Sequence, residues 1–151
     1  MGVREGGCLC ALLVILILLA GCGGDGDSRA VDAYRQHLAA VCRTGRRQEQ
    51  AVANYKTYAE FVVFIVRLRK ITDRDLAAVR ALKAPASMKS LATKLDEVDA
   101  QTKVLVDGLA RQVLKGQDPR GAVTQFRPQS RRLTLEANEL FQKLGVPSCV
   151  S

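Results

Sequence analysis

The apolar residues between positions 31 and 144 recur at steps of three and four, and this spacing constrains the fold more than any other feature. Residues three and four apart share one face of an α-helix, whereas a half-buried strand alternates every second residue. The four stripes are Val31, Tyr34, Leu38, Val41 and Gly45; Phe61, Ile65, Leu68, Thr72, Leu76 and Val79; Met88, Leu91, Leu95, Val98, Thr102, Leu105, Leu109 and Gln112; and Val123, Phe126, Ser130, Leu133, Ala137, Leu140 and Leu144. They predict four helices around a shared core.

Residues that favour helix ends bound several of these stretches. Asp27 or Ser28 can cap the first helix, and Ala84-Pro85 separates the second from the third. Asp118-Pro119 offers an N-cap and a first-turn proline to the fourth helix, which Gly145 is expected to end.

Two segments are less regular. Residues 61–66 have a strand-like composition, but no other segment offers a partner strand, so the stretch at about 55–82 is predicted to be helical. Whether Thr72-Asp73-Arg74-Asp75 breaks this helix stays open. Pro128 lacks an amide hydrogen and is expected to kink the fourth helix near residues 124–127.

Short connections between the four stretches imply antiparallel neighbours. The predicted fold class is therefore all-α, an up-down-up-down four-helix bundle. With 151 residues, the chain forms one domain, which excludes a two-domain nucleotide enzyme and a multi-span transporter.

The N-terminal segment has the features of an export signal. Residues 8–20 carry no charge but are too few to span a bilayer, which needs about 20 apolar residues. Leu19-Ala20-Gly21-Cys22 resembles the lipobox of bacterial lipoproteins. The resemblance implies cleavage before Cys22 and a diacylglyceryl thioether on its sulfur, which would anchor the chain in the membrane. The alternatives are an ordinary cleaved signal and an uncleaved anchor.

This interpretation divides the chain into a lipoprotein signal peptide at 1–21, a lipidated Cys22 with a flexible tether at 22–28, and the bundle at 29–151. Cleavage would remove Cys8 and Cys10, and the lipid would occupy Cys22. Only Cys42 and Cys149 would remain, so a Cys42–Cys149 disulfide is predicted for an exported chain. Two unpaired buried thiols or a metal pair are the alternatives, and the lack of a nearby His or third Cys disfavours a metal.

The similarity extends beyond the lipobox. Cys42 late in the first helix, a Leu82-Lys83-Ala84-Pro85 break and a closing Leu144-Gly145-Val146-Pro147-Ser148-Cys149 resemble small helical lipoproteins of high-GC Gram-positive bacteria. This resemblance implies a location and a fold but no chemistry.

The sequence contains no recognisable catalytic or metal-binding motif, and it therefore predicts no enzyme, no cofactor and no metal site. His37 is the single His, and the sequence has no GxSxG, HExxH or phosphate-binding loop. The acids have a simpler interpretation as surface ion pairs four residues apart, namely Asp99–Lys103, Asp107–Arg111 and Glu139–Lys143.

Basic residues exceed acidic ones by 23 to 15, which gives a net charge of +8 and favours anionic partners. Three groups stand out, namely Arg43, Arg46 and Arg47; Arg67, Arg69, Lys70 and Arg74; and Arg127, Arg131 and Arg132. Anionic lipid or wall polymer are the candidate partners, whereas an ordinary solvated surface is the simpler explanation. Nucleic acid is a poor partner for an exported, tethered chain.

The sequence thus predicts a non-enzymatic module at the extracytoplasmic face of the cell membrane, where it engages an envelope protein or another envelope component. The alternative is a carrier of a small apolar ligand, with Phe61, Phe64 and Phe126 lining a cavity that the Pro128 kink opens between the second and fourth helices.

Overall fold

A computed structural model describes residues 25–150 of the chain. It contains four long helices, α2 (Asp25–Val52), α3 (Tyr58–Ala81), α4 (Lys89–Leu114) and α5 (Pro119–Leu144). Two short 3₁₀ helices, η1 (Ala86–Met88) and η2 (Pro147–Cys149), precede α4 and follow α5. No strand occurs between residues 25 and 150.

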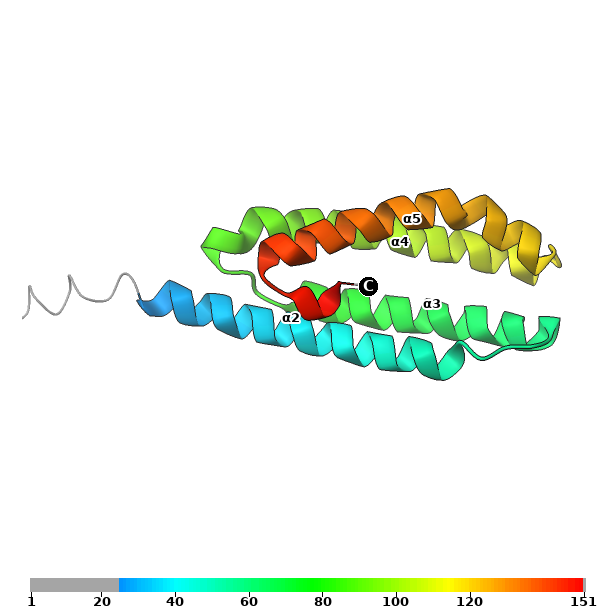
Figure 1. Ribbon diagram of the computed structural model, residues 1–151, viewed down its shortest axis with the longest axis horizontal. Helices are drawn as coiled ribbons and strands as arrows, with labels where there is room; N and C mark the ends of the chain where they lie inside the picture. Colours follow the sequence, from blue (N-terminus) through cyan, green and yellow to red (C-terminus); the bar gives the residue numbers. More distant parts are fainter. Residues whose placement is uncertain (1–24, 151) are drawn as a thin grey trace, which may run out of the picture.

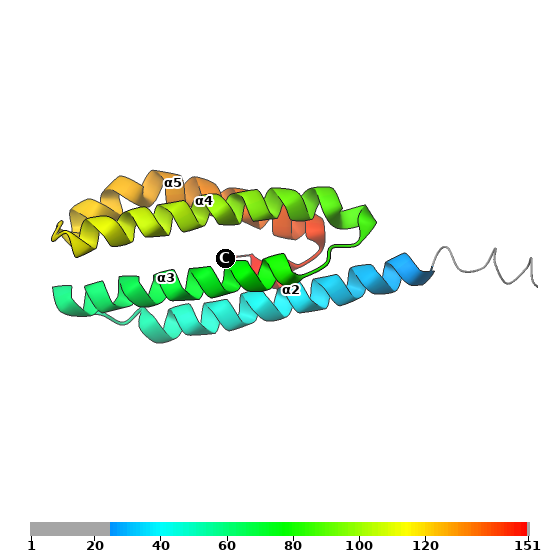
Figure 2. The same cartoon turned by 180° about the vertical axis from the view of Figure 1, so that it is seen from behind.

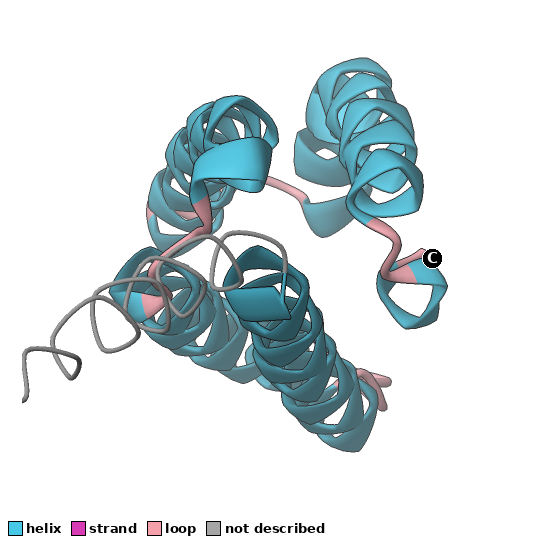
Figure 3. Cartoon of the chain, turned by 90° about the vertical axis from the view of Figure 1, so that its left-hand side faces the viewer, coloured by secondary structure: helices cyan, strands magenta, loops and turns pink. Residues whose placement is uncertain are grey.

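The helices run up, down, up and down along one long axis, with α2 and α3 forming one pair and α4 and α5 the other (Figures 1 and 2). Seen along that axis, the four helices surround a common centre, and the C-terminal segment with η2 lies beside them (Figure 3). The predicted all-α four-helix bundle is confirmed. No helix of the described part combines the length and hydrophobicity that crossing a bilayer requires.

The predicted stripes form two core clusters. The larger joins α2, α4, α5 and the C-terminal segment, and its most deeply buried side chains include Leu38, Leu95 and Leu144. The smaller joins α3 to the C-terminal part of α4 and the start of α5, through Phe61, Ile65, Leu109, Ala110, Val113 and Ala122.

The disulfide between Cys42 and Cys149 is present, with a sulfur–sulfur distance of 2.07 Å. Gly145, at φ 73°, ends α5 in the left-handed conformation that glycine tolerates best. The chain then turns back, and η2 brings Cys149 beside α2. The bridge therefore ties the last helical turn of the chain to the first long helix, as the sequence predicts.

The helix ends match the sequence in part. Asp118 caps α5 by accepting a 2.9 Å hydrogen bond from the Gly121 amide, and Pro119 starts the helix as expected. Helix α2, however, already includes residues 25–28. Asp27 and Ser28 thus lie inside the helix rather than at its start, and part of the predicted tether is helical.

Both uncertain segments are helical throughout. Helix α3 does not break at Thr72. The Thr72 hydroxyl donates to the Leu68 carbonyl oxygen at 3.0 Å instead of capping the start of a new helix. Helix α5 continues through Pro128, and its ribbon bends in the N-terminal half (Figure 1). The start of α3 carries a reciprocal cap of Thr57 and Glu60, which was not among the predicted helix ends.

We expect Asp118→Ala to lower the free energy of unfolding by about 1 kcal/mol, because the substitution leaves the Gly121 amide without its side-chain acceptor. Chemical denaturation checks this value. Gln117→Ala is the matched control, and an equal loss in that variant would contradict the capping role.

Candidate functional site

A cleft of about 240 Å³ lies between α2, α3 and α4 beside the disulfide. Val41, Leu76, Val79 and Phe141 provide apolar walls. The charged lining consists of Arg46 and Glu49 from α2, Asp75 from α3 and Asp99 from α4. The sequence pattern indicated no polar cluster in a cleft, whereas the fold brings these four side chains together.

Asp99 is the most perturbed acid of the cleft. Burial raises the pKa of Asp99 to about 7, Asp96 and Asp75 add to the shift through like charge, and Arg80 opposes it. The Asp99 carboxyl forms no hydrogen bond or ion pair with another residue in the 25–150 range. Near neutral pH this group therefore exists in both protonation states and can donate or accept a hydrogen bond.

The other two acids of the cleft are Glu49 and Asp75, which lie where α2 and α3 approach each other closely. A Cβ atom on Gly45 would overlap Asp75 Oδ2, so a larger residue at position 45 would displace the Asp75 carboxylate from its present place. Partial burial of the Glu49 carboxyl, together with the charge of Asp75, raises the pKa of Glu49, and Arg46 opposes this. The cleft therefore disfavours the ionised form of two of its three carboxyl groups.

Arg46 also holds the C-terminal segment. Its Nη2 donates to the carbonyl oxygens of Ser148 and Val150, each at 3.1 Å. Arg35 Nε donates to the Leu144 carbonyl oxygen at 2.9 Å. Of these groups, Arg46 and the two bridged cysteines line the cleft and form one of its walls.

Of the three predicted ion pairs, only Glu139–Lys143 forms. Lys103 does not pair with Asp99, because it pairs with Asp73 on α3 and with Asp107, which lies one turn further along α4. The two predicted pairs on α4 are therefore wrong, and the reason is that the neighbouring helix supplies competing charges.

At Asp107, likewise, a cation from the neighbouring helix replaces the predicted partner on α4. Its Oδ1 lies 2.6 Å from Arg69 Nε, while Arg111 takes no part. Burial alone would raise the pKa of Asp107, but Lys103 and Arg69 lower it overall. This carboxylate is thus ionised and serves to join α3 to α4.

The three phenylalanines of the predicted carrier cavity lie in or against the smaller core cluster. Phe61 is 3% exposed in the smaller core cluster, and Phe64 and Phe126 pack against that cluster. Tyr55 adds ring contacts, with centroids 4.9 Å from both Phe61 and Phe64. Phe126 lines a hollow of about 320 Å³ between α4 and α5, whereas Phe64 lines one of about 370 Å³ between α2 and α3.

A second concave surface follows the outside of α2 and α3. Two hollows of about 470 and 370 Å³ adjoin through their shared residues Ala51, Val52 and Arg67. We call this surface the α2–α3 groove. It is lined by Gln48, Ala51, Val52, Asn54, Ala59, Glu60, Val63, Phe64, Arg67, Lys70, Ile71 and Arg74.

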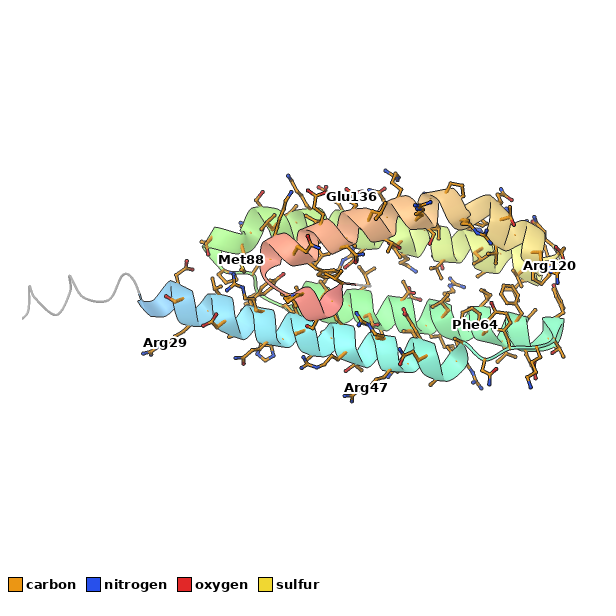
Figure 4. All side chains as sticks on the ribbon, viewed as in Figure 1. Arg29, Arg47, Phe64, Met88, Arg120 and Glu136 are labelled. Atoms are coloured by element: carbon orange, nitrogen blue, oxygen red, sulfur yellow. A yellow bond between two sulfur atoms is a disulfide. The ribbon has the colours of Figure 1, made fainter. Side chains whose placement is uncertain are left out.

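The predicted basic groups separate in the structure. Arg46 bonds the C-terminal segment, Arg69 pairs with Asp107, and Arg74 pairs with Asp75. Arg67 and Lys70 face the groove and have no acidic partner among the described residues. Arg47 points outward from α2, on the side opposite Glu136 of α5 (Figure 4).

The remaining predicted site residues divide into two sets. Leu19, Ala20, Gly21 and Cys22 lie outside the described residues. His37 is exposed on α2. Across residues 25–150, no group of three or more His, Cys, Asp or Glu side chains is placed to hold a metal ion.

Comparison of the chain with protein-family models, with curated proteins and with solved structures finds no match.

Proposed function

We propose that the chain is a lipid-anchored helical module on the extracytoplasmic face of the cell membrane, which acts by binding an envelope component rather than by catalysis. The Cys42–Cys149 disulfide is the observation that carries this proposal. Disulfides persist in oxidising compartments and are rare in the cytosol, so the bridge supports export.

The sequence and the surface support the remaining parts of the proposal. Leu19-Ala20-Gly21-Cys22 has the form of a lipidation signal, and two acyl chains would give a stable anchor. The α2–α3 groove combines apolar lining with cations that lack acidic partners, which is the kind of surface that a binding module presents.

The anchor is tested by the intact mass of the protein extracted from membranes. We expect a denatured mass of residues 22–151 plus a diacylglyceryl group, less two hydrogens for the disulfide. Cys22→Ala should abolish the lipid mass and release the chain from the membrane fraction. Cys10→Ala, in the same leader, is the matched control. A lipid-free wild-type mass would contradict the anchor.

The cleft favours a second candidate function, the transport of a small ligand that has an apolar body and a cationic group. Its apolar walls and the unpartnered Asp99 carboxyl support this candidate. The same mass experiment separates the two, because a carrier would show an additional small mass in the native spectrum that is lost on denaturation.

A further inference from the structure

We propose that the α2–α3 groove is a docking surface for anionic phospholipid, so that the bundle lies along the membrane instead of projecting from it. This inference rests on the proposed function, because the anchor would hold the groove close to the bilayer.

The apolar part of the groove is accessible. Val63 of α3 is 49% exposed, and Ala51 and Val52 continue the apolar strip on α2. Tyr55, in the connection between the helices, is 42% exposed. Exposed aliphatic side chains beside a tyrosine are typical of protein surfaces that enter the interfacial layer of a bilayer.

The charge of the groove is complementary to phospholipid phosphate. Arg67 and Lys70 border the apolar strip without acidic partners in the described part of the chain. Glu60 is the one acid that lines the groove, and its carboxylate already accepts hydrogen bonds from the amides of Lys56 and Thr57 at 2.7 and 2.9 Å. Each cation that lies near an anionic membrane surface strengthens binding to it.

The position of the groove determines the orientation. Helix α2 has 28 residues and is therefore about 42 Å long, and the groove lies toward its C-terminal end. An anchor ahead of α2 and a groove near the C-terminal end of that helix can both contact the bilayer only when the long axis of the bundle lies along the membrane. An acidic protein partner would not require this orientation.

The test uses the full chain with a single fluorescent reporter, since the natural sequence has no Trp. Val63→Trp places the reporter in the groove, and Leu135→Trp places one at a 60% exposed position on α5 as the matched control. Each protein is reconstituted into phosphatidylcholine vesicles with or without phosphatidylglycerol, containing brominated lipid as quencher. We expect a blue shift and quenching only for Val63→Trp with phosphatidylglycerol.

Charge variants complete the test. Arg67→Gln with Lys70→Gln should remove the quenching, whereas Arg127→Gln with Arg131→Gln on α5 should preserve it. If the protein binds vesicles but the Val63→Trp emission is not quenched, the groove proposal is wrong and the lipid anchor is unaffected. If the purified protein carries no covalent lipid, the anchor proposal is wrong. Quenching of that protein by added vesicles would still support the groove proposal.

Three other results would overturn the proposal. Equal quenching in vesicles without phosphatidylglycerol would show that the tether alone brings the reporter to the lipid. A blue shift that depends on protein concentration, without vesicles, would show that a second copy covers the groove. A shift caused by soluble polyphosphate but not by vesicles would identify an anionic polymer as the occupant.

Discussion

Loss of the Cys42–Cys149 disulfide is expected to lower the free energy of unfolding by about 4–5 kcal/mol. The bridge joins residues 107 apart and so encloses α3, α4 and α5 in one covalent loop. In the chain-entropy model, cutting so long a loop gives the unfolded chain much additional conformational freedom. A loss of this size is comparable to the total stability of many domains.

Denaturant titration with and without a thiol reductant measures this effect. The double variant Cys42→Ser with Cys149→Ser should behave like the reduced wild type and should not respond to reductant. Ser148→Ala, next to the bridge, is the control. A loss below about 1 kcal/mol would contradict the prediction and would mean that packing of Val146 and the bonds from Arg35 and Arg46 already fix the C-terminal segment.

Asp99→Asn is expected to raise the free energy of unfolding by about 2–4 kcal/mol at pH 8. The folded-state pKa of Asp99 is raised from 3.8 to about 7, so the folded chain binds this proton more tightly than the unfolded chain does. The ionised carboxylate therefore opposes folding above pH 7. The amide of asparagine removes that charge at the same position.

The sign of the pH dependence follows from the raised pKa. Asp99 destabilises the wild type progressively as the pH rises from about 4 to about 7, and its effect disappears below pH 4, where both states are protonated. The stability difference between Asp99→Asn and wild type should therefore shrink toward zero on acidification. Glu97→Gln, at an exposed position of α4, is the control. A difference that does not vary with pH would contradict a partly buried Asp99 whose ionisation opposes folding.

The main features of the fold could be predicted because they depend on local spacing. Apolar steps of three and four define the helices, and Asp118 and Gly145 mark the ends of α5 by their backbone preferences. The disulfide could be predicted because only two cysteines remain once the leader is interpreted as a lipoprotein signal. Thr57 and Glu60 also have the spacing of a capping box, so the start of α3 was equally predictable from the sequence.

The cleft could not be predicted, because it depends on how three helices are rotated relative to one another. On its own helix, Asp99 stands four residues before Lys103, which is the ordinary spacing of a surface ion pair. In the bundle, Lys103 turns to Asp73 of α3, and Asp99 is left facing the cleft. A sequence pattern describes one helix at a time, so it does not show that Asp73 and Asp99 compete for Lys103.

Only the basic character of the α2–α3 groove could be predicted from the sequence. The run of Arg67, Arg69, Lys70 and Arg74 indicated a basic surface, but it did not indicate which cations remain available. Neighbouring positions of a helix face different directions, so Arg69 reaches Asp107 on α4 while Arg67 and Lys70 stay on the outside.

The disulfide also determines how the molecule carries a mechanical load. A force applied between the two ends of the chain would pass along α2 to Cys42 and through the sulfur bridge to Cys149. Helices α3, α4 and α5 lie outside that path and bear no tension, so stretching can lengthen only the segments before Cys42 and after Cys149. Pulling on the ends can therefore unfold the part of α2 before Cys42, but it cannot extend α3, α4 or α5 while the bridge is intact.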